Sequence, residues 1–155
     1  MLKKIASFSI NHDVLVPGIY VSRVDGDCVT YDLRLKRPNM GDYIAQGALH
    51  TLEHLIATYL RSSEEADAIV YFGPMGCRTG CYLVARDTLS REDAIRLIRD
   101  AFRFAAEFEG EIPGAKRAEC GNYREHDLEA ARREAEAYRK VIERWTPADM
   151  VYPAE

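Results

Sequence analysis

The chain has 155 residues, of which 47% are hydrophobic, and this size and composition support one globular domain with a buried core. Its 21 basic and 25 acidic residues give a net charge of -4 at pH 7. A nucleic-acid partner normally requires a basic excess, so this balance argues against one. No apolar run has the length of a signal peptide or a membrane span. We therefore expect a single cytoplasmic domain over residues 1–155, with no membrane partner.

The first predicted elements are two strands, over residues 19–24 and 29–36, joined by a turn at Gly26 and Asp27. In the second strand apolar and polar residues alternate, which indicates one buried face and one polar face. Arg34 belongs to the polar face. It is either a solvated arginine or an anchor for a substrate.

A helix is predicted over residues 44–61, and the motif His-Thr-Leu-Glu-His lies within it. Residues four apart lie about one turn up the same helix face, so His50 and His54 can bind one divalent metal together. Glu53 would point from the flank toward whatever the metal holds, and this spacing is known from metalloenzymes. Four aliphatic residues recur at helical spacing and should enter the core: Leu49, Leu52, Ile56 and Leu60.

A second hairpin is predicted from strands at residues 68–72 and 81–86. Three glycines and a proline in the loop between them indicate a sharp turn or a close approach of the backbone to another group. Cys77 lies in the middle of this loop.

Two more helices are predicted toward the end of the chain. Ser90, followed three residues later by Asp93, is close to a capping box and should open a helix through residue 108. The last helix should span about residues 127–144. The order of elements predicts an α+β fold, a four-stranded, largely antiparallel sheet with helices packed on one face.

Two histidines leave a divalent ion short of protein ligands, and several residues are candidates for a third. Cys77, Cys81, Cys120 and His126 are all open to this role. Cys120 is favoured because it lies in a loop just before a helix, where a ligand can be presented. Cys81 and Cys28 are expected to pack as small hydrophobic side chains. His126 is expected at the start of the last helix, with an indirect role at the metal also open.

Four segments together resemble the S-ribosylhomocysteine lyase (LuxS) family. They are HTLEH, then PMGCRTG followed by a YLV strand, then ECG, and then HDLE. Near the start of the chain, SFSINH and YDLRLKRPN are also similar to segments of the family, so the resemblance covers nearly the whole chain.

This resemblance implies a metal centre and a pair of acid–base groups. It implies that His50, His54 and Cys120 are the metal ligands and that Glu53 and Cys77 exchange protons with the substrate. Fe(II) is the implied native ion, and Zn(II) or Co(II) can substitute for it. The implied reaction cleaves the thioether of S-ribosylhomocysteine to homocysteine and 4,5-dihydroxy-2,3-pentanedione, the precursor of the quorum-sensing signal autoinducer-2.

The resemblance also implies how the substrate is held. It suggests that Ser7, His12 and Arg34 contact S-ribosylhomocysteine in a site built between the two subunits of a homodimer. Three departures from the family pattern put the pocket shape and turnover in doubt. The segment between Tyr59 and Gly73 is a few residues shorter than in most relatives. Gly73 stands where a serine is expected, and Cys81 stands where an aromatic residue is expected and could offer a second thiol near Cys77.

Two other interpretations of the HxxEH motif remain at this point. An inverzincin-type metallopeptidase would use Glu53 to activate water, but it would leave Cys77 and Cys120 without roles. A structural metal-binding module would close a four-ligand site with His50, His54, Cys77 and Cys120.

Overall fold

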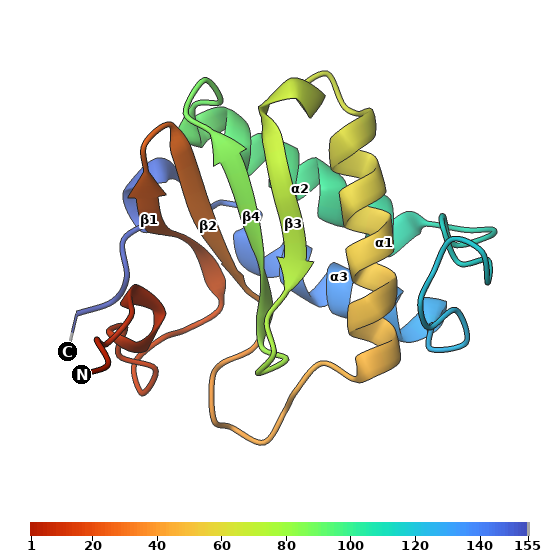
Figure 1. Ribbon diagram of the computed structural model, residues 1–155, viewed down its shortest axis with the longest axis horizontal. Coiled ribbons are helices and arrows are strands. Elements are labelled where there is room, and N and C mark those ends of the chain that lie inside the picture. Colours follow the sequence, from red (N-terminus) through yellow and green to blue (C-terminus); the bar gives the residue numbers. More distant parts are fainter. Residues whose placement is uncertain (155) are drawn as a thin grey trace.

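The computed structural model describes residues 1–154 and contains, within them, four strands and three α-helices (Figure 1). Each neighbouring pair of strands is antiparallel, in the sheet order β1-β2-β4-β3. The predicted α+β fold is confirmed. The strands are β1 (Gly18–Asp25), β2 (Cys28–Arg34), β3 (Ile69–Pro74) and β4 (Gly80–Arg86). The helices are α1 (Gln46–Ser62), α2 (Arg91–Glu107) and α3 (Leu128–Ile142).

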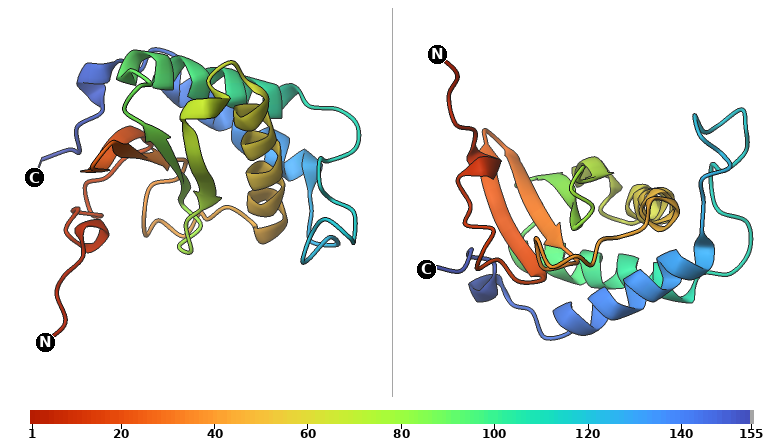
Figure 2. Two further views of the ribbon diagram at one scale, coloured as in Figure 1. Left: turned by 45° about the horizontal axis from the view of Figure 1, so that its top comes forward. Right: turned by 90° about the horizontal axis from the view of Figure 1, so that it is seen from below.

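The helices form a layer over one face of the sheet, and α1 lies alongside β3 (Figure 2). Residues that alternate along β2 face this layer, because Val29, Tyr31 and Leu33 are buried among residues from the helices. No α-helix of residues 1–154 covers the opposite face of the sheet, which we therefore call the helix-free face (Figure 2). All four aliphatic residues predicted for the core of α1 are buried, namely Leu49, Leu52, Ile56 and Leu60.

Both later helices begin at side-chain caps. The Ser90 hydroxyl accepts a hydrogen bond from the Asp93 N–H at 3.1 Å, as the sequence predicted. At α3, the Asp127 carboxylate accepts from the Ala130 N–H at 3.0 Å. Each cap satisfies an amide that the first helical turn leaves unpaired. Within residues 1–154, no helix is both long and apolar enough to cross a membrane.

Most boundaries differ from the prediction by one or two residues. Two of these differences arise because the backbone donates hydrogen bonds to the β3–β4 turn instead. Helix α1 begins at residue 46 rather than 44, since the Ile44 N–H donates to the Arg78 carbonyl at 2.9 Å. Strand β2 ends at residue 34, since the Leu35 and Lys36 N–H groups both donate to the Thr79 carbonyl, at 2.8 and 2.9 Å. The turn that carries Cys77 is therefore attached to the segment between β2 and α1.

The segment after α3 covers the outer edge of β1. The Trp145 indole N–H donates to the Ile19 carbonyl at 2.8 Å. Farther along, the Tyr152 ring stacks on Tyr20 with the ring centroids 5.0 Å apart. This places the Tyr152 hydroxyl over the helix-free face of the sheet, where it reaches the side chain of Asp32.

The burial of α1 can be tested with Leu52→Ala. Because Leu52 is fully buried, the substitution should lower the free energy of unfolding by about 2–5 kcal/mol. Urea unfolding of the metal-free protein, followed by circular dichroism, measures this. The matched control is Leu2→Ala, at a position that is 99% exposed, where the change should stay within about 0.5 kcal/mol. Equal losses in the two variants would contradict this placement of α1.

Candidate active site

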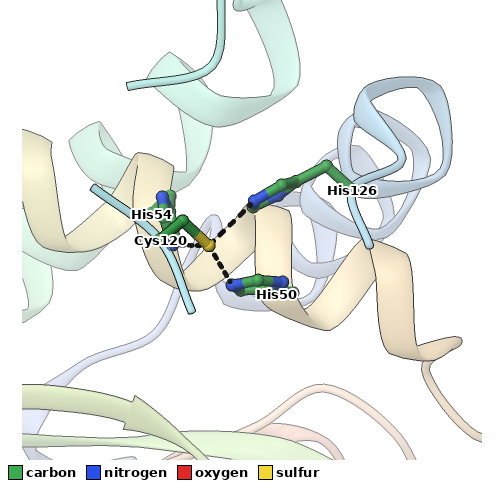
Figure 3. A group of neighbouring side chains, drawn as sticks. All are labelled: His50, His54, Cys120 and His126. Carbon is green, nitrogen blue, oxygen red and sulfur yellow. Dashed lines mark hydrogen bonds between the residues drawn. The ribbon is translucent and has the colours of Figure 1, made fainter. Parts of the chain in front are cut away.

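Four metal-binding side chains meet where α1 faces the loop between α2 and α3. The ligand atoms of His50, His54, Cys120 and His126 all lie within 4.8 Å of one another. The Cys120 sulfur lies at the centre of the group (Figure 3). It is 3.4 Å from His50 Nε2, 3.9 Å from His54 Nε2 and 3.8 Å from His126 Nε2. We refer to these four residues as the His/Cys cluster.

The two helix histidines are held in the form that binds a metal. His50 Nδ1 lies 2.8 Å from the Glu125 carbonyl, and His54 Nδ1 lies 2.8 Å from the Pro113 carbonyl. A carbonyl oxygen can only accept, so the proton of each neutral ring is on Nδ1. The lone pair of each Nε2 therefore faces Cys120. Hydrogen bonds of this kind to the outer nitrogen are typical of histidines that bind metals.

The loop geometry that supplies one of these carbonyls depends on a glycine. Gly114 directly follows Pro113 and has a φ of +67°, in the left-handed region that glycine adopts without strain. A Cβ at Gly114 would lie 3.3 Å from His54 Nδ1. A larger residue would therefore disturb both the turn and the histidine that it orients.

His126 lies next to Asp127, the cap residue of α3, close to the helix start as predicted, but its side chain belongs to the cluster. Its ring stacks on His50 with the centroids 4.0 Å apart, and its Nδ1 lies 3.0 Å from the Thr51 hydroxyl. Burial, followed by the charges of His50 and His54, lowers the pKa of His126 below its usual value. His126 is therefore a neutral nitrogen donor at pH 7. The sequence named it as a candidate ligand, but the contact with Thr51, 75 residues away, is not visible in any local pattern.

Arg34 is not a solvated arginine, which corrects one of the two interpretations of the polar strand face. Its side chain is only 2% exposed and pairs with Asp32 through two contacts, Nε–Oδ1 at 3.1 Å and Nη2–Oδ2 at 2.7 Å. Burial alone would lower the pKa of Arg34, but the charge and hydrogen bonds of Asp32 outweigh it and raise that pKa. The arginine is thus a fixed cation, and it lies beside the β3–β4 turn, with Nη1 4.0 Å from the Cys77 sulfur.

The thiols of Cys77 and Cys81 are in opposite environments. Cys77 is exposed in the turn, whereas Cys81 is fully buried in the core. Burial raises the pKa of Cys81 far above its usual value, and the charges of Glu53, Asp32 and Cys77 raise it further. Cys81 therefore stays a neutral thiol and offers no second reactive group. Because the charges of Glu53 and Cys77 both act on the Cys81 thiol, both side chains lie near it.

The remaining predicted substrate residues lie in the N-terminal segment. Ser7 is part of a short 3-10 helix (Ala6–Phe8) and lines a groove with Tyr71 and Tyr82 on the helix-free sheet face. His12 Nδ1 donates to the Ile10 carbonyl at 2.9 Å. Figure 1 shows this segment on the opposite side of the molecule from the loop between α2 and α3. One chain alone does not bring Ser7 and His12 to the His/Cys cluster.

Comparison with known proteins identifies the family. The sequence profile of the S-Ribosylhomocysteinase (LuxS) family matches residues 5–148. The chain is 49% identical to an S-ribosylhomocysteine lyase of Phocaeicola vulgatus, with 99% of each chain covered. It is 45% identical to S-ribosylhomocysteine lyases of Clostridium beijerinckii and Borreliella afzelii, over 98% of this chain and 99% and 100% of theirs. The chain belongs to the LuxS family.

Membership of the LuxS family decides between the interpretations of the HxxEH motif. The chain is an enzyme of the carbon–sulfur lyase class, rather than a metallopeptidase or a structural metal-binding module. The structural module predicted from the sequence is also wrong in its fourth ligand, which was Cys77. In this LuxS protein, His126 occupies the fourth position of the cluster, and Cys77 lies outside it.

The departure at Gly73 also has a structural explanation. The Tyr71 side chain lies across Gly73, and a Cβ at that position would overlap its phenol ring. A serine at this position would therefore require the Tyr71 ring to move aside. Tyr71 is 56% exposed and lines the same groove as Ser7.

The assignment of Cys120 as a ligand is tested by Cys120→Ala. Removing the sulfur at the centre of the cluster should lower bound metal from about one ion per chain to less than about a tenth. Elemental analysis of the purified protein measures the stoichiometry. Cys28→Ala is the matched control, because Cys28 is a free, half-buried thiol outside the cluster. Full metal occupancy in Cys120→Ala would show that the cysteine is not a ligand.

Proposed function

We propose that this LuxS protein converts S-ribosylhomocysteine to homocysteine and 4,5-dihydroxy-2,3-pentanedione, the precursor of autoinducer-2. The observation that carries the proposal is the His/Cys cluster in a chain of this family, together with an exposed thiol, Cys77, and a carboxylate, Glu53, whose charges both act on the buried Cys81. The reaction adds no water, since the atoms of the two products sum to those of the substrate. It is an elimination, which agrees with the lyase class.

The chemical difficulty is that sulfur leaves the last carbon of the ribose, far from the carbonyl of the open sugar. The hydrogen on the neighbouring carbon becomes acidic only when a carbonyl stands next to it. The carbonyl must therefore migrate along the chain by way of enediolates, with a proton removed from one carbon and returned to the next. Elimination of the homocysteine sulfur then follows. Each proton transfer needs a group within hydrogen-bond reach of the carbon concerned.

In the proposal, Cys77 and Glu53 carry these protons. Cys77 is exposed at the tip of the β3–β4 turn, and Glu53 is half-buried on α1, one residue before the ligand His54. Since both act electrostatically on Cys81, they flank one region of the core rather than lying far apart. Two groups on different elements can reach adjacent carbons of one bound sugar, as successive transfers require.

The cluster fits the proposed metal. Two imidazole Nε2 atoms with free lone pairs and one sulfur suit Fe(II), Zn(II) or Co(II), and we propose one Fe(II) per subunit, held by His50, His54 and Cys120. When bound, the ion supplies Lewis-acid stabilisation of negative charge on the sugar oxygens. His126, stacked on His50, keeps that ring in place and excludes water from one side of it.

The proposed substrate contacts require a second subunit. Ser7 and His12 lie across the molecule from the cluster, and the groove beside Ser7 is on the sheet face that has no helix over it. A homodimer that pairs these faces would bring the N-terminal segment of one chain to the cluster of the other. Such a site would enclose a polar sugar away from water. Arg34, beside Cys77, is the proposed contact from the same chain as the metal.

The proposal also includes the domain organisation and the cellular compartment of the enzyme. We propose that residues 1–155 form one lyase domain that works in the cytoplasm. All four cysteines are free, as a reducing compartment favours, and the proposed chemistry needs two of them reduced.

The acid–base assignment predicts that Cys77→Ala and Glu53→Gln each lose at least about 99% of thiol release from S-ribosylhomocysteine. Both should keep the fold and full metal content, because neither residue belongs to the cluster. The measurement pairs release of free homocysteine thiol with metal stoichiometry.

Cys81→Ala is the matched control, a second thiol that is buried and should retain activity within about threefold. The assignment is wrong if Cys77→Ala turns over near the wild-type rate. It is equally wrong if Cys81→Ala is the inactive variant and still holds its metal.

The shared site predicts complementation between inactive variants. Cys77→Ala and His12→Ala homodimers should each be inactive. After subunits are exchanged, about half the dimers are mixed, and each mixed dimer has one intact site, so about a quarter of wild-type thiol release should return. Sedimentation should show about twice the 17.6 kDa chain mass. No recovery after proven exchange, or an active monomer, would contradict the shared site.

A further inference from the structure

Thr79 lies between the buried arginine and the exposed thiol. Its Oγ1 is 2.8 Å from Arg34 Nη1 and 3.1 Å from the Cys77 sulfur, which makes it closer to that sulfur than Arg34 is, at 4.0 Å. The residue is only 2% exposed. The proposed reaction gives this hydroxyl no role.

The direction of both hydrogen bonds follows from counting hydrogens. A threonine hydroxyl carries one hydrogen and two lone pairs, and a guanidinium can only donate. Arg34 must therefore donate to Thr79 Oγ1, which leaves the hydroxyl hydrogen for another acceptor. Among the described residues, the Cys77 sulfur is the other partner of this hydroxyl. A Cys77 thiolate carries no hydrogen and can only accept, so in that state the Thr79 hydroxyl donates to the sulfur.

Arg34 cannot turn away from this arrangement. Its Nε and Nη2 are bonded to Asp32, and only Nη1 is directed at Thr79. Asp32 in turn accepts from the Tyr152 hydroxyl at 2.8 Å. Asp32 and Arg34 are both almost fully buried, so little water competes for these groups. The C-terminal segment therefore helps to fix the arginine.

The backbone of Thr79 is fixed as well. Its carbonyl accepts from both the Leu35 and the Lys36 N–H groups, at 2.8 and 2.9 Å. The preceding residue, Arg78, holds a φ of +60°, and its N–H donates to the Met75 carbonyl at 3.0 Å. Because these hydrogen bonds hold the backbone of Thr79, its side chain starts from a fixed position, as a positioning group requires.

We propose that Thr79 is a positioning residue for Cys77, whose hydroxyl relays the Arg34 hydrogen bond to the sulfur and holds the thiolate as an acceptor facing the substrate. Its catalytic consequence depends on the proposed function, in which Cys77 moves protons. The hydrogen bond itself does not depend on any substrate.

The experiment compares Thr79→Val, which has the same shape without the hydroxyl, with Thr79→Ser, which keeps the hydroxyl. The rate at which iodoacetamide alkylates Cys77 is measured against pH, with the modified residue identified by peptide mass spectrometry. In Thr79→Val the pH of half-maximal rate should rise by about one unit, since a hydrogen bond to a charged group is lost. In Thr79→Ser it should stay within about 0.3 unit.

The other groups that act on Cys77 are the same in both variants. They are Arg34 on β2 and Cys81 and Tyr82 on β4. A difference between the valine and serine variants therefore reports the hydroxyl. Turnover gives a second measure, because Thr79→Val should lower kcat for thiol release about tenfold while KM stays within about twofold.

An unchanged alkylation profile in Thr79→Val, with only thermal stability reduced, would show that Thr79 merely satisfies Arg34 and would overturn the proposal. Should Thr79→Val fail to fold, Thr79→Ala takes its place, because it also lacks the hydroxyl and places no second methyl group beside Arg34. An unchanged profile in Thr79→Ala overturns the proposal in the same way. If Cys77→Ala is active, the role of Cys77 in the reaction fails, but a shifted alkylation profile still supports the hydrogen bond.

Discussion

The hydrogen bonds from His50 and His54 to the loop between α2 and α3 are the constraint on which the active site depends. This loop has no regular secondary structure over most of its length, and yet it must place Cys120 accurately. The Pro113 and Glu125 carbonyls accept from the two rings and so attach the loop to α1 on both sides of Cys120. The same bonds place the proton of each neutral ring on Nδ1 and leave each Nε2 free to bind a metal. One set of contacts therefore holds the loop and orients both histidines.

The chemistry is divided between two sides of α1. One side of the helix packs into the core, and another presents His50 and His54 to the loop. The β3–β4 turn lies elsewhere and carries the exposed Cys77, which is tied to the segment before α1 through Thr79 and Arg78. Cys81 lies in the core near both Glu53 and Cys77, and burial keeps it neutral. A rigid core thus fixes two reactive regions that are distant in sequence.

Local patterns in the sequence predicted the features that depend on neighbouring residues. The hairpin turn at Gly26 and Asp27, the cap at Ser90 and the buried residues of α1 are confirmed because each depends on a few adjacent positions. The alternation along β2 correctly separated the two sheet faces. It did not predict that Arg34 is buried, since the covering groups come from residues 79 and 152.

His126 shows the same limit at the metal centre. Its position before α3 was predicted, whereas its contacts with His50 and Thr51 depend on how the loop folds back onto α1. The position of Cys120 in a loop before a helix already favoured it among four candidate ligands, whereas the roles of Ser7 and His12 came only from the family resemblance. The structure brings Cys120 together with the three histidines, while its role as a ligand and the contacts of Ser7 and His12 remain predictions.

The central claim is that the protein eliminates homocysteine from the sugar without adding water. The most direct measurement incubates the Fe(II)-loaded protein with S-ribosylhomocysteine and identifies both products by mass spectrometry after the carbonyl product is trapped with an aromatic diamine. We expect equal amounts of homocysteine and trapped dihydroxypentanedione, and neither product after the metal is removed with a chelator. Homocysteine accompanied by ribose, which requires the addition of water, or no release of thiol by the metal-loaded dimer, would contradict the account.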